Sequence, residues 1–173
     1  LLPHVPQDMA ALCAATLDRF DAKVAPHLAM CRWQVVHNDL NPHNVLVDAK
    51  NPDRIAGVLD FGDMVRTPLV CDLGVAASYQ VEPAAALESL VGFTAAYHRV
   101  LPLTPVELSL VPDLTATRML TTICITSWRA VRYPENSAYI LRNYPLARAG
   151  LLALSALPRT EVMAALTTAC PME

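Results

Sequence analysis

The chain has 173 residues, of which 54% are hydrophobic and 17% are charged, and its formal net charge is -3. This length favours a single domain with a large apolar core, and the composition excludes a disordered or collagen-like chain. The few basic residues are scattered, so we expect neither a nucleic acid nor an anionic membrane surface as a partner. No apolar run approaches the roughly 20 residues of a membrane-spanning helix.

The sequence starts at Leu1 rather than at a methionine, and we expect it to be a piece of a longer chain. Its five cysteines are odd in number, widely spaced and set among apolar residues, without a C-x-x-C pair. That usage is typical of reduced core cysteines rather than of disulfides or a zinc site. It predicts a cytoplasmic protein.

In chain order, apolar residues at helical spacing predict a first helix over residues 7–25, ending near Pro26. Three short β-like segments follow, at residues 33–37, 44–48 and 55–61. The turn signal Asn51-Pro52-Asp53 lies between the second and the third segment. These two segments are therefore predicted to form a β-hairpin.

From Pro68 onward the periodicity is helical. Pro68 and Pro83 each open a helix, and Thr104 and Glu107 form a capping box at the start of a long helical stretch interrupted at Pro112. The predicted helices span residues 68–81, 83–101, 104–133, 135–142, 145–156 and 159–169. The expected fold class is α+β and mostly helical, with one domain over residues 1–173.

The polarity of this apolar chain is concentrated in one stretch, VVHNDLNPHNVLVD. His37, Asp39 and Asn44 form the pattern H-x-D-x-x-x-x-N there, and Asp60 of LDFGD lies at the end of the third predicted strand. A hairpin returns the second carboxylate to the edge where the first pattern lies. Phosphoryl transfer needs this chemistry, because a metal must bridge nucleotide phosphates while a separate carboxylate orients the attacking hydroxyl.

A simpler interpretation is that this polar loop only satisfies its own backbone through Asx-turns. The pattern H-x-D-x-x-x-x-N alone would leave the two interpretations balanced. The second motif at hairpin distance, with a helix before the pair and helices after it, favours the catalytic interpretation.

The loop resembles the catalytic loop of kinases, and DFGD resembles their metal-binding D-F-G. The wording HNDLNPHNVLVD…GVLDFGD is more similar to the aminoglycoside phosphotransferase and choline kinase superfamily. Within it the chain most resembles the hydroxylysine kinase-like group, including the kinase-like domains fused to class III aminotransferases. RYPENSAYILRNYPLARAGL is also similar to the C-terminal region of that group.

The resemblance implies the C-terminal lobe of a protein-kinase-like fold, with a small β-hairpin carrying the catalytic loop. Its catalytic segment would be residues 33–63, and residues 68–170 would form a helical substrate-binding region. The resemblance also implies roles for four side chains. Asp39 would be the catalytic base or would orient the hydroxyl, His37 would brace the catalytic loop, and Asn44 and Asp60 would bind Mg²⁺ with ATP as co-substrate.

Two further acidic residues, Asp63 and Asp72, could form an acidic pocket for the ammonium group of a cationic acceptor. Asp72 fits equally well with a second role, in which its carboxylate fixes the loop by accepting hydrogen bonds from backbone amides.

A kinase-like fold also needs an N-terminal lobe with a glycine-rich phosphate loop and a strand lysine. The two lysines, Lys23 and Lys50, lie on the first helix and in the predicted hairpin turn, and the five glycines are far apart. We therefore expect that the N-terminal lobe is absent from this chain. The surface where that lobe would dock is expected to be apolar, and to favour dimerisation when the lobe is missing.

Two functions remain open from the sequence. The first is an ATP-dependent phosphotransferase, a small-molecule kinase that phosphorylates a hydroxyl of an amino alcohol or aminoglycoside-like acceptor. The second is a non-catalytic module, derived from a kinase lobe, that binds a small ligand or a partner domain. The complete set of Asp39, Asn44 and Asp60 favours the first, because a binding module does not need all three.

Overall fold

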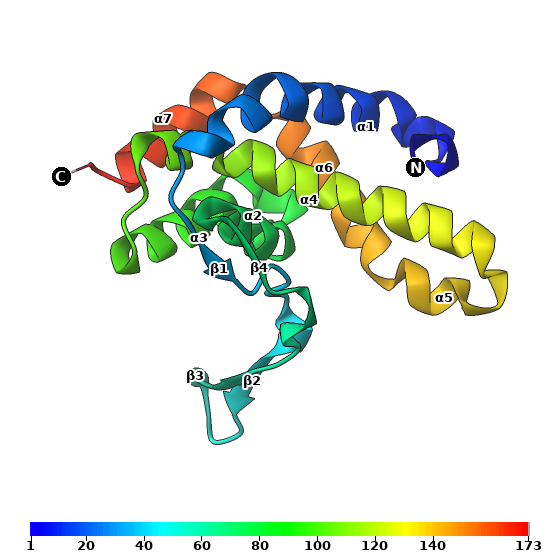
Figure 1. The fold of residues 1–173 in the computed structure, drawn as a ribbon, viewed down its shortest axis with the longest axis horizontal. Coiled ribbons are helices and arrows are strands. Elements are labelled where there is room, and N and C mark those ends of the chain that lie inside the picture. The colour runs from blue at the N-terminus through cyan, green and yellow to red at the C-terminus, as the bar shows by residue number, and fades with distance from the viewer. Residues whose placement is uncertain (173) are drawn as a thin grey trace.

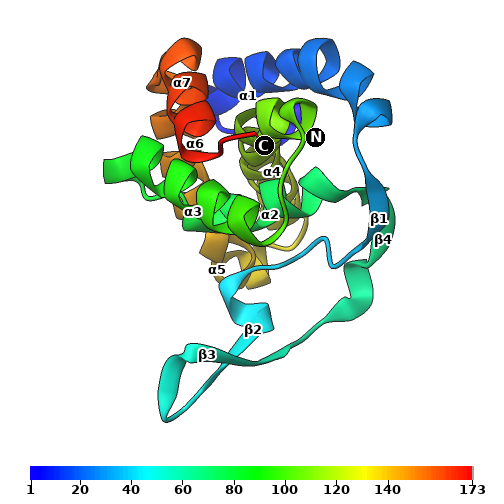
Figure 2. The ribbon, with the colours of Figure 1, turned by 90° about the vertical axis from the view of Figure 1, so that its left-hand side faces the viewer.

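The computed structural model describes residues 1–172 and consists of a helical body from which a β-hairpin extends (Figure 1). Figure 2 shows the same hairpin from the side, away from the helices. The α-helices are α1 (Gln7–Arg19), α2 (Leu69–Gln80), α3 (Ala86–Val100), α4 (Pro105–Arg132), α5 (Ser137–Ile140), α6 (Tyr144–Ala156) and α7 (Arg159–Ala169). The strands are β1 (Trp33–Val36), β2 (Val45–Asp48), β3 (Asn51–Val58) and β4 (Val65–Pro68).

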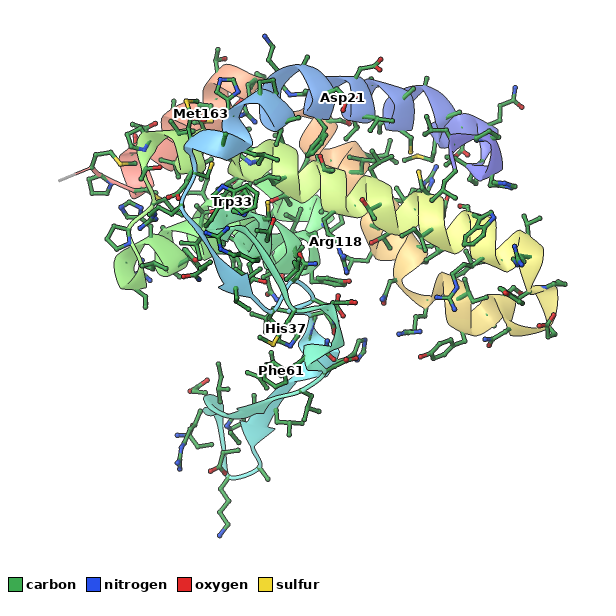
Figure 3. The ribbon with its side chains drawn as sticks, in the orientation of Figure 1. Asp21, Trp33, His37, Phe61, Arg118 and Met163 are labelled. Atoms are coloured by element: carbon green, nitrogen blue, oxygen red, sulfur yellow. The ribbon has the colours of Figure 1, made fainter. Side chains whose placement is uncertain are left out.

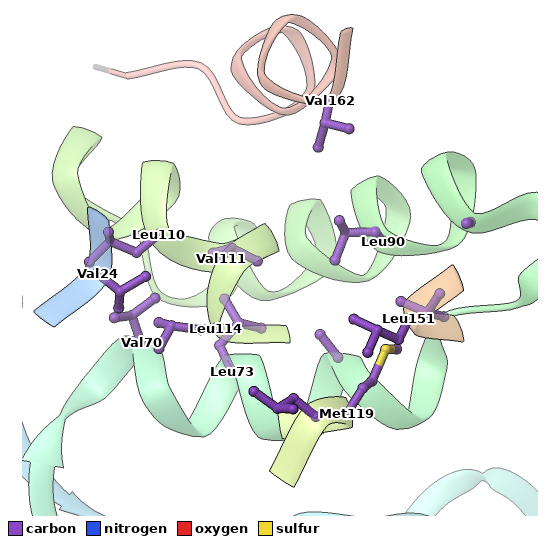
Figure 4. Close-up of a cluster of buried hydrophobic side chains, with 14 of the residues drawn as sticks. Val24, Val70, Leu73, Leu90, Leu110, Val111, Leu114, Met119, Leu151 and Val162 are labelled. Carbon is purple, nitrogen blue, oxygen red and sulfur yellow. The ribbon is translucent and has the colours of Figure 1, made fainter. Parts of the chain in front are cut away.

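The long helix α4 runs through the centre of the helical body, and α1, α2 and α6 pack against it. Apolar side chains from these helices and from α3 and α7 meet in one core, part of which Figure 4 shows. Its fully buried members include Val70 and Leu73 of α2, Leu90 of α3, and Val111 and Met119 of α4. This core fixes the helices that stand behind the β segments.

Two glycines allow helices to approach closely in this core. A Cβ atom on Gly74 of α2 would lie 2.7 Å from Cβ of Leu114 on α4. A Cβ atom on Gly150 of α6 would lie 2.7 Å from Cε of Met119, which is the end of a flexible side chain. The contact at Gly74 therefore sets the separation of α2 and α4 more strictly.

The capping box predicted for α4 is present, with Thr104 and Glu107 each bonded to the backbone of the other. The predicted interruption at Pro112 was wrong, because α4 continues through it as one helix of 28 residues. Proline has no N–H and leaves a carbonyl of the preceding turn without its helical partner. That carbonyl belongs to Leu108, and Arg159 of α7 donates to the neighbouring carbonyl of Ser109, so a tertiary contact supports the helix beside the missing bond.

The first helix also departs from its predicted form. Its α-helical part ends at Arg19, and the chain continues as a wider π-turn, Phe20–Val24, and a 3-10 segment, Ala25–Met30. Pro26 lies at the start of the 3-10 segment and does not end α1. Proline is tolerated in a first helical turn, where its missing N–H has no partner to lose.

The strands form two antiparallel two-stranded sheets, β1 with β4 and β2 with β3. The hairpin of β2 and β3 confirms that prediction, but β3 begins at Asn51, so the expected turn residues lie in the strand. The turn is at Ala49 and Lys50, where the amide of Lys50 donates to the Asp48 carboxylate at 2.8 Å. The strand β4 was not predicted.

All five cysteines are free, and four of them are buried, as expected of reduced core residues. Within residues 1–172 no single helix has the length and apolar character needed to cross a bilayer. Two consecutive segments, Pro134–Ala156 and Arg159–Ala169, reach that length and composition only together, and they are bent by 97°.

The close contact at Gly74 can be tested by adding a methyl group. Gly74→Ala is expected to destabilise the protein by about 1–3 kcal/mol, because the added carbon overpacks the contact with Leu114. Gly92→Ala is the matched control in α3, where nothing lies within 4 Å of the added carbon. It should instead stabilise by about 0.5–1 kcal/mol through helix propensity. Urea denaturation measures both, and equal effects would contradict the proposed close packing.

Candidate active site

The loop predicted to be catalytic connects β1 to β2 and lies where the two small sheets meet the helical body. Its second residue, Asn38, adopts a left-handed backbone conformation with φ of 64°. Asparagine tolerates this region better than most residues. The amide N–H of Asn38 donates to Oδ1 of Asp72 on α2 at 2.7 Å. A side chain of the helical body therefore holds the turn that precedes Asp39.

His37 links this loop to the segment before Asp60. Nε2 of its buried ring lies 2.8 Å from the carbonyl oxygen of Leu59, and Nδ1 accepts from the amide of Asp39 at 3.3 Å. Both contacts agree with a neutral ring that carries its proton on Nε2. The ring also packs against Phe61, with 5.1 Å between the ring centroids, and Figure 3 labels the two residues next to each other.

Asp39 is held by three side chains. Its Oδ2 accepts from the amide groups of Asn41 at 3.1 Å and Asn44 at 3.2 Å, and its Oδ1 accepts from Nη2 of Arg118 at 2.7 Å. The carboxylate is about 20% exposed. Since a carboxylate oxygen has two lone pairs, Oδ1 keeps one for a hydroxyl group that approaches from solvent.

Asn44 is buried and uses both its amide group and its backbone to order the site. Its Nδ2 donates to the carbonyl of Asp39 at 2.9 Å as well as to the Asp39 carboxylate, and its own carbonyl accepts from the amide of Leu59 at 2.8 Å. Leu59 is thus bonded to both Asn44 and His37. These two bonds bring Asp60, the next residue, to the base of the hairpin beside the loop.

Asp60 is exposed and has a left-handed backbone, with φ of 58°. Its Oδ1 accepts from the amide of Gly62 at 3.4 Å, which caps the short turn Phe61–Asp63. Left-handed backbone costs free energy in a residue other than glycine and is concentrated at functional sites. The conformation leaves Oδ2 of Asp60 without a hydrogen bond among the described residues.

The oxygen donors at the base of the hairpin have the chemistry that Mg²⁺ prefers. No group of three or more His, Cys, Asp or Glu side chains within residues 1–172 could hold a metal ion by itself. Mg²⁺ in phosphoryl-transfer sites, however, is usually bound by one or two protein oxygens together with substrate phosphates and water. Oδ1 of Asn44 and the carboxylate of Asp60 are hard oxygen donors of that kind, so these residues fit the ion.

The start of β1 is fixed by a second ion pair. Arg32 donates through Nη2 to Oε2 of Glu107 at 2.6 Å, and the Arg32 amide donates to Oε1 at 3.0 Å. Burial alone would raise the pKa of the fully buried Glu107. The hydrogen bonds from Arg32 and from the Thr104 amide outweigh it and hold the pKa below its usual value. The fold therefore favours a charged Glu107.

The structure thus brings His37, Asp39 and Asn44 together and places Asp60 beside them; their chemical roles stay predictions. Asp72 has the second of its two expected roles, since its carboxylate bonds the loop backbone. Burial raises the pKa of Asp72, against the effect of the Asn38 amide. Asp63 is exposed and has no side-chain hydrogen bond among the described residues.

Two residues that touch Asp39 or its partner were missed from the sequence. Arg118 of α4 pairs with Asp39, and the Tyr79 hydroxyl lies 3.2 Å from Nη2 of Arg118. The signal for Arg118 was its position, because it is a lone charge within a long run of small and apolar residues. A charge placed in such a run needs a partner when the helix is buried.

A comparison with protein families agrees with this geometry. The sequence model of the phosphotransferase enzyme family matches residues 2–103, which include the loop, the hairpin and Asp60. The chain belongs to this family. Arg118 lies beyond the matched residues.

Three hydroxylysine kinases are similar to the chain. The protein from Danio rerio is 28% identical over 144 residues, which are 82% of this chain and 40% of that protein. The protein from Mus musculus is 29% identical over 129 residues, 70% of this chain and 34% of that protein, and the protein from Bos taurus is 27% identical over 129 residues. The chain therefore spans 40% or less of the length of these relatives.

The bond from Asp72 to the loop can be tested with two variants. Asp72→Ala is expected to cost about 1–3 kcal/mol of stability, because it leaves the Asn38 amide without its acceptor. Asp72→Asn keeps an acceptor oxygen and removes a charge that burial disfavours, so it should stay within about 1 kcal/mol of the wild type. Urea denaturation compares them, and equal losses would show that the charge rather than the hydrogen bond is needed.

The ion pair at the start of β1 gives a pH-dependent prediction. Arg32→Ala leaves a buried carboxylate without its guanidinium and should cost about 3 kcal/mol at pH 7. The folded pKa of Glu107 is lowered, so the pair stabilises above the unfolded value near 4.3 and loses its effect as pH falls through the folded pKa. The difference between variant and wild type should then shrink on acidification.

Arg54→Ala is the matched control for this measurement. It removes an exposed pair with Asp48, in which the charged atoms are 3.6 Å apart, and is expected to cost less than about 1 kcal/mol. A similar loss in both variants would mean that burial of Glu107 does not matter.

Proposed function

We propose that the protein carrying this chain is a small-molecule kinase, which transfers the γ-phosphoryl group of ATP to a hydroxyl group of an amino alcohol or aminoglycoside-like acceptor. The observation that carries the proposal is the hydrogen-bonded set of His37, Asp39 and Asn44, tied through Leu59 to Asp60. Membership in the phosphotransferase family supports it. The names of the relatives favour an acceptor of the hydroxylysine type.

In this reaction the acceptor oxygen forms a bond to the γ-phosphorus while the bond to the β,γ-bridging oxygen breaks. Asp39 accepts a hydrogen bond from the acceptor hydroxyl through Oδ1, aims the oxygen at phosphorus and takes the hydroxyl proton as the new O–P bond forms. The transition state is loose and develops little new charge on that oxygen, so orientation is the main need. Asn41, Asn44 and Arg118 meet this need, because they fix the Asp39 carboxylate from three directions.

Asn44 and Asp60 would hold Mg²⁺ through their side-chain oxygens. The bound ion supplies positive charge that compensates the phosphate oxygens. Asp60 is exposed at the base of the hairpin, so its carboxylate is accessible to a nucleotide arriving from outside the helical body. His37 keeps the segment before Asp60 and the loop in one arrangement.

The chain would form the C-terminal lobe, and the N-terminal lobe that grips the nucleotide would lie outside it. Apolar side chains on and beside the hairpin are unusually exposed, and such a surface is typical of a contact with another part of a protein. They include Leu46, Val47, Ile55, Leu59 and Phe61. Two copies of the isolated lobe could associate through the same surface.

A non-catalytic binding module would need no such arrangement. A loop that only bound a ligand would gain nothing from a carboxylate oriented by two amides and an arginine, next to a second carboxylate on strained backbone. The kinase proposal accounts for each of these features.

The proposal is tested by turnover of the whole protein with ATP, Mg²⁺ and 5-hydroxylysine. Asp39→Asn is expected to lower kcat by about 10²–10⁴-fold, the usual effect of losing a positioned base. Asp60→Asn should lower it at least as much, and its fold should persist because asparagine also tolerates a left-handed backbone. Coupled measurement of ADP release gives these rates.

Asp53→Asn provides the control, since Asp53 is an exposed residue of β3 in the same hairpin. This variant should keep the wild-type rate. Near-normal turnover after substitution of Asp39 or Asp60 would overturn the assignment.

A further inference from the structure

The guanidinium group of Arg118 lies next to the carboxylate that is proposed to receive the acceptor hydroxyl. Its Nη2 uses its two protons on Oδ1 of Asp39 at 2.7 Å and on the Tyr79 hydroxyl at 3.2 Å. The group also lies over the Tyr79 ring, 5.9 Å from its centroid. Figure 3 shows Arg118 between the long helix α4 and the loop that carries His37.

The remaining nitrogens of Arg118 differ from each other. Nε is buried and has no partner within the described residues. Nη1 also has no protein partner there. Unlike Nε, it is not one of the buried nitrogens without a partner, so it keeps contact with solvent. The side chain keeps about 25% of its surface exposed. Nη1 therefore offers charged N–H donors to the solvent-accessible space beside Asp39.

Among the described residues, Asp39 is the one carboxylate that forms an ion pair with Arg118. The carboxylate of Asp72 is half-buried and is used by the Asn38 amide. Asp63 lies on the exposed turn that follows Asp60, on the hairpin side of the site. The charged donor next to Asp39 belongs to an arginine, and an arginine N–H forms a strong hydrogen bond with a carboxylate.

We propose that Arg118 binds a carboxylate of the acceptor through Nη1, so that the enzyme selects hydroxy acids, such as hydroxy amino acids, over amino alcohols of the same shape. The inference rests on the proposed kinase function and assigns its acceptor specificity to one residue. Nη2 of the same side chain fixes Asp39, so one guanidinium group would orient both the acceptor and the carboxylate that receives its hydroxyl.

The test uses two acceptors that differ only in charge, 5-hydroxylysine and 5-hydroxylysine amide, with the whole protein, ATP and Mg²⁺. The wild type should prefer the acid by about 10-fold to 100-fold in kcat/KM, the effect of one charge-assisted hydrogen bond. Arg118→Gln should lower kcat for both acceptors, because Asp39 loses a partner. It should also abolish the preference, mainly by raising KM for the acid.

Tyr79→Phe is the matched control. It removes the other contact of Nη2 and leaves the guanidinium group in place, so the preference for the acid should persist. A second measurement needs no variant: lysine, which lacks the hydroxyl, should inhibit the wild type with a lower inhibition constant than lysinamide.

The outcomes separate the two proposals. Equal use of acid and amide by the wild type, or an equal loss on both acceptors in Arg118→Gln with the preference retained, would overturn the carboxylate assignment while the kinase function stands. Absence of phosphoryl transfer to either acceptor would overturn the kinase proposal with these substrates, and the inference with it.

Discussion

One face of α4 forms ion pairs with both ends of the segment 32–39, which includes β1 and leads into the candidate site. Glu107 holds Arg32 at the start of β1, and Arg118 holds Asp39 at the far side of the loop turn. The two α4 residues are eleven positions apart, which is about three helical turns, so they lie on the same side of the helix and about 16 Å apart along it. The position of the loop is therefore fixed by two contacts with a single helix, α4.

The rest of the site depends on how α2 lies against α4. The close contact at Gly74 lets α2 approach α4, and two residues away on α2, Asp72 reaches the amide of Asn38. Asn38 is one of two non-glycine residues within residues 1–172 with positive φ, and the other is Asp60. Asp72 of α2 holds Asn38, and the loop residues His37 and Asn44 hold Leu59, the neighbour of Asp60. Packing of the helical body therefore maintains the backbone at Asn38, and the loop in turn positions Asp60.

The sequence predicted which loop residues lie together better than it predicted the residues that support the loop, for a physical reason. His37, Asp39 and Asn44 are close in sequence, and the hydrogen bonds that join them span at most five residues. Asp72 and Arg118 reach the loop across separations of 34 and 79 residues, and no local pattern records such contacts. From the sequence, Asp72 fitted two roles equally well, binding a cationic acceptor or fixing the loop backbone. Arg118 was noticed only as a charge that interrupts an apolar helix.

The errors in secondary structure have the same origin. Pro112 is a helix breaker in local terms, but α1 and α7 pack against α4, and the Arg159 guanidinium donates to the Ser109 carbonyl, next to the Leu108 carbonyl that Pro112 leaves without its helical donor. The strand β4 is four residues long and is defined by its pairing with β1, not by its own pattern. The hairpin turn lies at Ala49 and Lys50, where the Asp48 side chain forms an Asx-turn. The turn signal Asn51-Pro52-Asp53 was more evident in the sequence, but it comes after this turn.

The two sides of the candidate site differ in how completely they are built. On the side proposed to receive the acceptor, His37 and Asn44 are buried and Asp39 is held by three side chains. On the side proposed to bind phosphate, Asp60, Phe61 and Asp63 are exposed in the short turn at the base of a two-stranded hairpin that stands away from the helices. A two-stranded hairpin has little stability of its own and gains order from whatever packs on it. The acceptor side is therefore preorganised by this chain alone, whereas the phosphate side would acquire its final order from the nucleotide and the lobe that binds it.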